Sequence, residues 1–118
     1  MSDSRDWFTH HVDALVHATL SYIHRHRKDC RAAAQHALNA SQSELQAARS
    51  ANGAIRTLLA VDAAILALQG GDIGAATNII AEFEPNAHES FAAAFQYLRQ
   101  DIQKLTKHSK KRRRRLWR

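Results

Sequence analysis

Apolar residues recur every three or four positions along most of the chain, and short polar or glycine-containing stretches interrupt them. At about 100° per residue, this spacing places the apolar side chains on one side of an α-helix. The chain of 118 residues contains only one proline and four glycines, and it is rich in alanine. Because this composition favours helices over strands, the sequence predicts an all-α fold.

Breaks in this pattern divide the chain into five expected helices. The breaks fall at the polar stretch His24–Asp29, at Asn52-Gly53, at Gly70-Gly71 and at Pro85. The expected helices cover approximately residues 4–24, 31–51, 54–69, 73–83 and 86–108. A helix that continues through the polar stretch fits the same pattern and would join the first two. We therefore expect one compact antiparallel bundle of four or five helices.

The first helix has an apolar stripe that we expect to face the core. Its members are Phe8, Val12, Leu15, Val16, Thr19 and Ile23. His10, His17 and His24 lie seven residues apart on a line roughly 150° from the centre of that stripe. We interpret this line as a solvated face rather than a metal site, because bundle-core metal ligands point inward from several helices.

The third expected helix is apolar around nearly its whole circumference, which is typical of a central, buried helix. Asp62 lies in the middle of it. A buried carboxylate is costly unless it is paired or hydrogen-bonded. We therefore expect Asp62 to meet an Arg or His of another helix, or to lie on a face that opens to solvent, to a groove or to a partner chain.

Two surfaces are candidates for a homodimer contact. The last helix carries apolar residues spaced 4, 3, 4, 3 along the chain, namely Phe91, Phe95, Leu98, Ile102 and Leu105. This is a short heptad seam, and its simplest role is packing within the chain. The second helix is rich in alanine, and small residues would let a neighbouring helix come close.

Charge is distributed unevenly between the two ends of the chain. Residues 107–118 hold eight of the 17 Lys and Arg residues and no acid. Residues 1–106 hold nine basic and eleven acidic residues, which leaves a net charge of −2. Dense like charges repel one another, and little apolar area is available to order them. We expect a helical domain over residues 1–106 and a disordered basic tail over residues 107–118.

The composition of the tail predicts binding to nucleic acid, either DNA or RNA. Its basic residues are Lys107, Lys110, Lys111, Arg112, Arg113, Arg114, Arg115 and Arg118. Each cation that neutralises a phosphate releases a counterion, and the planar arginine fork matches phosphate oxygens. Trp117 could stack on an unpaired base. The tail has no base-reading geometry, so the prediction is a non-enzymatic nucleic-acid-binding or nucleoprotein-assembly protein.

Other partners fit the same tail. Leu116 and Trp117 beside the basic run suit an anionic membrane surface. The run also resembles a nuclear-import signal or a site for an acidic protein partner, or it serves as a solubilising tail. The rival function is therefore a helical interaction module, such as an adaptor or effector, whose tail is an address. The expected location is the cytoplasm, or the nucleus if the tail acts in import.

No motif in the sequence indicates an enzyme, a cofactor or a metal. There is no glycine-rich phosphate loop, serine-nucleophile motif or zinc-finger spacing. Cys30 has basic neighbours but no evident Cys–His–acid arrangement, so we expect a buried structural thiol. The longest apolar stretch, Leu58–Leu68, is about 11 residues, whereas a membrane-spanning helix needs about 20. A transmembrane segment is therefore not expected.

The stretch His36–Ala40, on the expected outer side of the alanine-rich helix, resembles the motif of histidine phosphotransfer domains. That family consists of four-helix bundles with an exposed histidine, and the resemblance implies phosphoryl acceptance by His36. The family typically has Lys and Gly at the third and fourth positions after the histidine. Here those positions are Asn39 and Ala40, so the lysine that helps hold the phosphoryl group is absent.

The hairpin Leu66–Pro85 resembles a tetratricopeptide helix–turn–helix. The shared features are the Gly-Gly-Asp turn, the small residues Ala75 and Ala76, and the proline after the second helix. The chain has no second copy at the expected spacing of about 34 residues. We interpret the likeness as the general chemistry of a helical hairpin.

Overall fold

The computed structural model describes the backbone of residues 6–116 and the side chains of residues 6–111. It contains five α-helices: α1 (Asp6–His26), α2 (Cys30–Ser50), α3 (Gly53–Gln69), α4 (Ile73–Phe83) and α5 (Ala92–Leu116). Two single-turn 3₁₀ helices, Glu84–Asn86 and Glu89–Phe91, join α4 to α5. Since residues 6–116 contain no strand, the predicted all-α bundle is confirmed.

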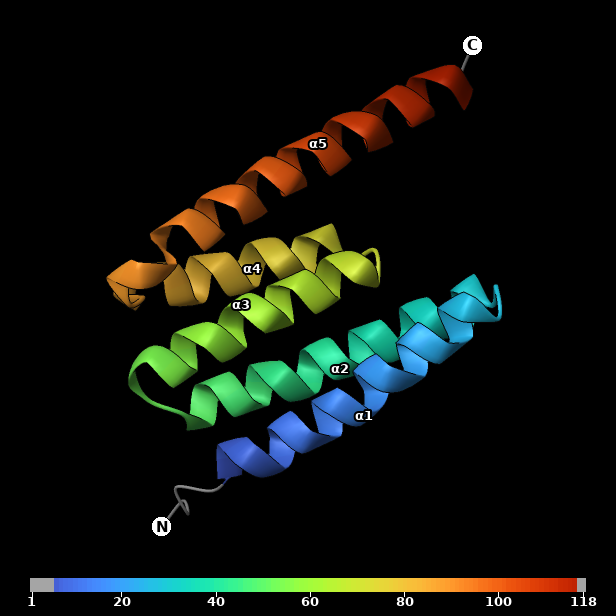
Figure 1. The fold of residues 1–118 in the computed structure, drawn as a ribbon. Helices are drawn as coiled ribbons and strands as arrows, with labels where there is room; N and C mark the ends of the chain where they lie inside the picture. Colours follow the sequence, from blue (N-terminus) through green and yellow to red (C-terminus); the bar gives the residue numbers. More distant parts are fainter. Residues whose placement is uncertain (1–5, 117–118) are drawn as a thin grey trace.

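Each helix packs mainly against its neighbours in chain order, and consecutive helices run antiparallel (Figure 1). The contact between α1 and α2 is the most extensive, whereas α5 touches α3 and α4 only lightly. Arg49 of α2 donates hydrogen bonds of 2.7 and 3.0 Å to the Glu82 carboxylate of α4. This pair bridges α2 and α4, which flank α3 in the stack.

Aspartate caps begin two of the helices. The Asp29 carboxylate accepts a hydrogen bond from the Ala32 N–H at the start of α2. The Asp72 carboxylate accepts one from the Ala75 N–H at the start of α4. Gly71 ends the preceding turn with φ 81°, a conformation that glycine adopts without strain.

The core is formed by small side chains of α2 and α3 and by larger ones of α4 and α5. Buried alanines line the contact between α2 and α3, among them Ala40, Ala47, Ala60, Ala63, Ala64 and Ala67. The predicted central position of α3 is confirmed, since eight of its residues are buried.

Both of the predicted dimer surfaces take part in packing within the chain. The seam of α5 packs within the chain, with Phe95 and Leu98 buried against the body. The alanine-rich helix α2 lies between α1 and α3 and is covered on both sides (Figure 1). The intramolecular role of the seam is therefore confirmed for Phe95 and Leu98, whereas a homodimer through either surface stays a prediction.

The orientation of α1 is the reverse of the sequence prediction. Six of its large apolar residues are exposed, whereas Trp7 and Leu20 are half-buried and Ala14 and Ser21 are buried against α2. The Ser21 hydroxyl donates a 2.7 Å hydrogen bond to the Ala33 carbonyl of α2. Small side chains let the two backbones approach closely. Since α2 presents mainly alanine, it offers large apolar side chains no pockets on this face.

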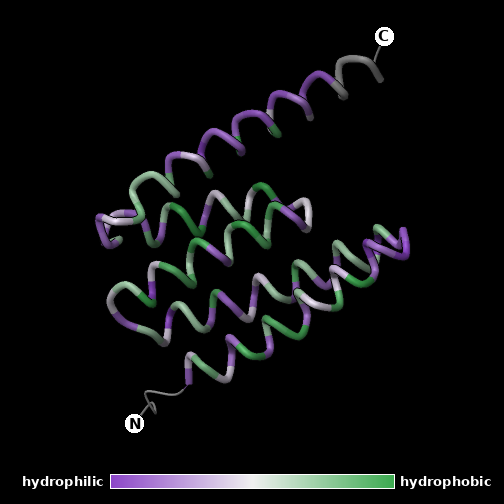
Figure 2. Tube along the Cα trace, in the orientation of Figure 1, coloured by the Kyte–Doolittle hydropathy of each residue, from purple (hydrophilic) through white to green (hydrophobic). Residues whose placement is uncertain are grey.

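The basic segment also differs from the prediction, because α5 continues through Lys107 to Leu116. The expected domain boundary at Thr106 is therefore not the end of the helix, and residues 107–116 have a helical backbone. Lysine and arginine are good helix formers, and cations at a helix C-terminus interact favourably with the helix dipole. Figure 2 shows α5 becoming hydrophilic toward this end. Trp117 and Arg118 lie outside the described residues.

Gly70 allows the turn after α3 to lie against α2. A Cβ at this position would stand 2.5 Å from Leu38 Cδ2 and 3.1 Å from the Ala34 carbonyl oxygen. We predict that Gly70→Ala lowers the free energy of unfolding by about 1–3 kcal/mol, because backbone and side chain must both shift. Chemical denaturation monitored by circular dichroism measures this change.

Gly74→Ala is the matched control, because its Cβ would meet only the Asp72 carboxylate at 3.6 Å. Alanine there should raise stability by about 0.5–1 kcal/mol through the lower flexibility of the unfolded chain. Equal effects at Gly70 and Gly74 would contradict the close contact between the turn and α2.

Candidate functional site

The exposed face of α5 carries a row of lysines. Lys107, Lys110 and Lys111 are exposed and occupy positions i, i+3 and i+4, so they share one face of the helix. Lys104 lies one turn earlier on the same face and is also exposed. We refer to these four residues, Lys104, Lys107, Lys110 and Lys111, as the lysine stripe.

The lysine stripe points away from the body of the protein. On a helical wheel it lies roughly opposite Leu98 and Ile102, which pack toward α3 and α4. Burial decreases along α5, from buried Leu98 through half-buried Ile102 to exposed Leu105. The helix then extends past the neighbouring helices (Figure 1). The stripe is therefore accessible to a large partner along its length.

For four of the other predicted site residues, the structure describes the backbone but not the side chain. Arg112, Arg113, Arg114 and Arg115 lie on the helical backbone of α5, and their side chains are outside the described range. Lys104 was missed by the sequence prediction, because the basic segment was expected to begin where the helix ended. The spacing of Lys104, Lys107 and Lys111 would have revealed it if the helix had been extended.

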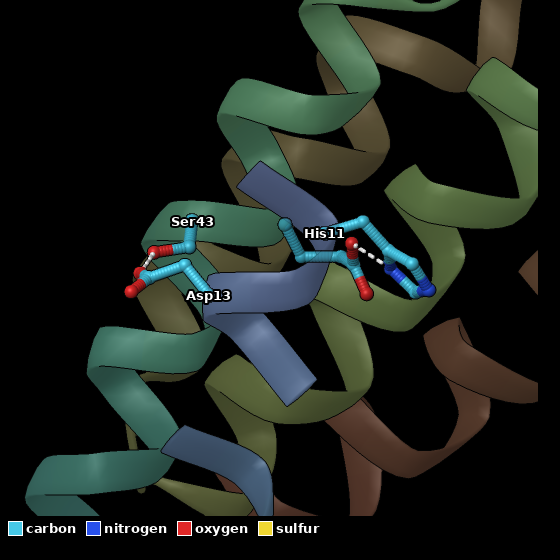
Figure 3. A network of polar contacts seen from close by, with 4 residues as sticks. His11, Asp13 and Ser43 are labelled. Carbon is cyan, nitrogen blue, oxygen red and sulfur yellow. Dashed lines mark hydrogen bonds and ion pairs between the residues drawn. The ribbon is translucent and has the colours of Figure 1, made fainter. Parts of the chain in front are cut away.

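A second polar cluster joins α1, α2 and α3. The Glu44 side chain of α2 is fully buried, and its Oε1 lies 2.7 Å from Nδ1 of His11 in α1. The Glu44 Oε2 has no hydrogen-bond partner at ordinary distance among the described residues. Nearby, the Ser43 hydroxyl donates a hydrogen bond to the Asp13 carboxylate (Figure 3). These contacts attach the polar side of α1 to α2.

Asp62 of α3 completes this cluster, since it is half-buried next to Glu44. Burial raises the pKa of Glu44 from 4.5 to about 9, with a further contribution from the neighbouring Asp62 carboxylate. Glu44 is therefore protonated at neutral pH, and its Oε1 shares a hydrogen bond with Nδ1 of the His11 ring. The group beside Asp62 is thus a second carboxyl rather than the expected Arg or His.

Three histidines are stacked at the other end of the contact between α1 and α2. The Nδ1 atoms of His17 and His36 lie 3.1 Å apart, so one ring donates a hydrogen bond to the other. The His24 ring stacks on His36 with centroids 5.3 Å apart and an interplanar angle of 8°. The prediction that this line of histidines faces solvent is wrong for His17 and His24, which are half-buried. It is confirmed for His10, which is exposed.

The position of His36 also differs from the expectation drawn from phosphotransfer domains. Its ring is half-buried and lies against His17 and His24 of α1, instead of on an outer face of α2. A response regulator would need direct access to this ring, and α1 stands in the way.

The thiol of Cys30 is the next candidate for chemistry. Cys30 is exposed, so the expected burial of its thiol is wrong. It lies in the first turn of α2, where the turn between α1 and α2 leaves it uncovered.

Among the side chains of residues 6–111, no group of three or more His, Cys, Asp or Glu could hold a metal ion.

An apolar groove lies between α3 and α5, with a volume of about 400 Å³. Its apolar walls are supplied by Ile65, Leu68, Leu98 and Leu105, and Lys104 of the lysine stripe lies at its edge.

Within residues 6–116, no helix has the length and apolar character needed to cross a bilayer.

Comparisons with known proteins returned no similarity: no protein-family model, no curated protein and no solved structure matches the chain. The candidate sites therefore stand on their own geometry.

The raised pKa of Glu44 predicts a dependence of stability on pH. A carboxyl whose pKa is higher in the folded state stabilises the fold below its unfolded value of 4.5, and this stabilisation is lost as the pH rises toward about 9. We predict that Glu44→Gln, which keeps the neutral shape, is more stable than the parent at pH 8 by roughly 2–4 kcal/mol.

The measurement is urea unfolding of both proteins between pH 6.5 and 8.5. Histidines titrate in the lower part of this range, but both proteins contain the same histidines, so the difference between their slopes reports Glu44. The parent should lose up to about 1.4 kcal/mol per pH unit from this group, and Glu44→Gln should not. The control is Glu89→Gln, because Glu89 is exposed and should leave the slope unchanged. Parallel slopes for the parent and Glu44→Gln would show that Glu44 is ionised in the fold.

Proposed function

We propose that the protein binds nucleic acid, without catalysis, through the basic C-terminal half of α5. The observation that supports this proposal is the lysine stripe, in which four exposed cations share one helix face opposite the packing face. Arg112, Arg113, Arg114 and Arg115 continue the charge along the same helix. Cations at regular helical spacing can neutralise several phosphates at once.

The distribution of charge supports a polyanion as the partner. Residues 1–106 have a net charge of −2, so attraction for phosphate is concentrated at one end of the molecule. An α-helix fits the major groove of duplex DNA, and a helix that extends from its domain can enter that groove without collision. Lysine contacts to phosphate position a protein and give affinity, but they do not read bases.

We predict that Lys107→Gln/Lys111→Gln weakens binding to short duplex DNA and to single-stranded RNA by roughly ten-fold at about 0.1 M salt. Each lost phosphate contact should reduce the slope of log affinity against log salt by about 0.7–0.9. Fluorescence anisotropy over a series of salt concentrations measures both quantities. A chain ending at Thr106 should lose most of the remaining affinity.

The matched control is Lys28→Gln/Arg31→Gln, which removes the same charge at the turn between α1 and α2. Both residues are exposed, and α3 and α4 separate this turn from α5 in the order of the stack. If both double variants weaken binding equally, the protein responds to net charge alone and the proposed interface is incorrect. Absence of binding by the parent at low salt would reject nucleic acid altogether.

A helical interaction module remains the second candidate, and one observation favours it. The large apolar side chains of α1 are exposed, which is unusual for a surface without a partner. In that function the basic segment would serve as an address, for import or for an anionic membrane. Phosphotransfer is not part of the proposal, because α1 covers His36.

A further inference from the structure

The outer face of α1 has the pattern of a helix that pairs with another helix. Five of its exposed residues are spaced 4, 3, 4, 3 along the chain: Phe8, Val12, Leu15, Thr19 and Tyr22. We refer to these five residues as the α1 seam. Phe8 is 56% exposed and Leu15 is 50% exposed, so the described residues leave about half of each side chain uncovered. Heptad spacing of this kind is typical of side-by-side helix packing.

Further apolar side chains widen the α1 seam. Val16 and Ile23 lie beside it and are 52% and 39% exposed. The Thr19 hydroxyl donates a 2.8 Å hydrogen bond to the Leu15 carbonyl, so it is satisfied within α1. Thr19 can therefore enter an apolar contact through its methyl group at little cost.

The order of side chains in the α1 seam is symmetric about Leu15. Read from either end, it runs aromatic, β-branched, leucine, β-branched, aromatic. If two copies of α1 pair in antiparallel orientation about Leu15, Phe8 lies opposite Tyr22, Leu15 lies opposite itself, and Val12 lies within one residue of Thr19. A two-fold interface requires this kind of self-complementarity, since each copy contributes the same surface.

The charges at the two ends of α1 favour the same orientation. Asp6 lies in its first turn, and the last turn carries the basic residues His24, Arg25 and His26. Antiparallel pairing places the first turn of one copy, which contains Asp6, at the same level as the basic last turn of the other. Parallel pairing would instead place the two basic last turns at the same level, and like charges oppose it.

We propose that the α1 seam is a homodimer interface, in which two copies of α1 pair antiparallel about a two-fold axis at Leu15. The partner is a second copy of this chain, because both the side-chain order and the end charges complement themselves. The interface is separate from the lysine stripe, so the proposal does not depend on nucleic-acid binding.

Sedimentation velocity of the full chain, from about 1 to 200 μM, tests the interface. The parent should dimerise within this range, and Leu15→Glu should raise the dissociation constant at least twenty-fold. The matched control is Tyr97→Glu on α5, which removes an apolar side chain that is 65% exposed and adds the same charge. This control should dimerise like the parent. A parent that stays monomeric at 200 μM, or a Leu15→Glu variant that still dimerises, would overturn the proposal.

Cysteine cross-linking tests the orientation without placing a charge in the α1 seam. In a Cys30→Ser background, Leu15→Cys lies at the two-fold axis and should form an intermolecular disulfide under mild oxidation. Phe8→Cys should not cross-link to itself, because at about 1.5 Å per residue the two sites lie roughly 20 Å apart. An equal mixture of Phe8→Cys and Tyr22→Cys chains should cross-link. Efficient Phe8→Cys self-cross-linking would indicate a parallel pair and contradict the model of pairing proposed here.

Discussion

The close approach of α2 to its neighbours is the constraint on which the rest of the structure depends. Its buried positions are mostly alanine and serine, so it can exclude water only if α1 and α3 come near enough to touch its backbone. Two serine hydroxyls exploit that closeness. Ser21 of α1 reaches the Ala33 carbonyl of α2, and Ser41 of α2 reaches the Ala63 carbonyl of α3, each at 2.7 Å. Such bonds satisfy the hydroxyls while the helices stay in contact.

This close packing determines the orientation of α1. A helix that presents leucine and phenylalanine to α2 would be held away by their volume and would leave voids around the alanines. A helix that presents Ala14 and Ser21 can approach. The imidazoles beside them then lie at the edges of the contact, where His11 meets Glu44 and His17 meets His36. The polar side of α1 is therefore the packed side, and its large apolar side chains face outward.

The sequence predicted the features of the fold that depend on local chemistry. The number of helices, the central position of α3 and the packed seam at Phe95 and Leu98 all follow from the spacing of apolar residues and from the breaks between helices. The orientation of α1 could not be predicted in this way, because periodicity identifies an apolar face but not which surface covers it. The cluster of Glu44 with Asp62 was missed for a related reason. Their proximity is a tertiary contact between two helices, and the sequence places them 18 residues apart.

At the end of α5, by contrast, local chemistry gave the wrong prediction. Charge density predicted a disordered tail, because repulsion between cations opposes compaction. Compaction is not needed for a single helix that extends from the body, and an unbroken run of good helix formers can continue a helix that tertiary packing has already nucleated. Phe95 and Leu98 anchor that nucleus against α3 and α4. The order of the stack then places the α1 seam and the lysine stripe at opposite edges of the molecule (Figure 1). Pairing through α1 would therefore leave both lysine stripes exposed, so self-association and polyanion binding do not compete for one surface.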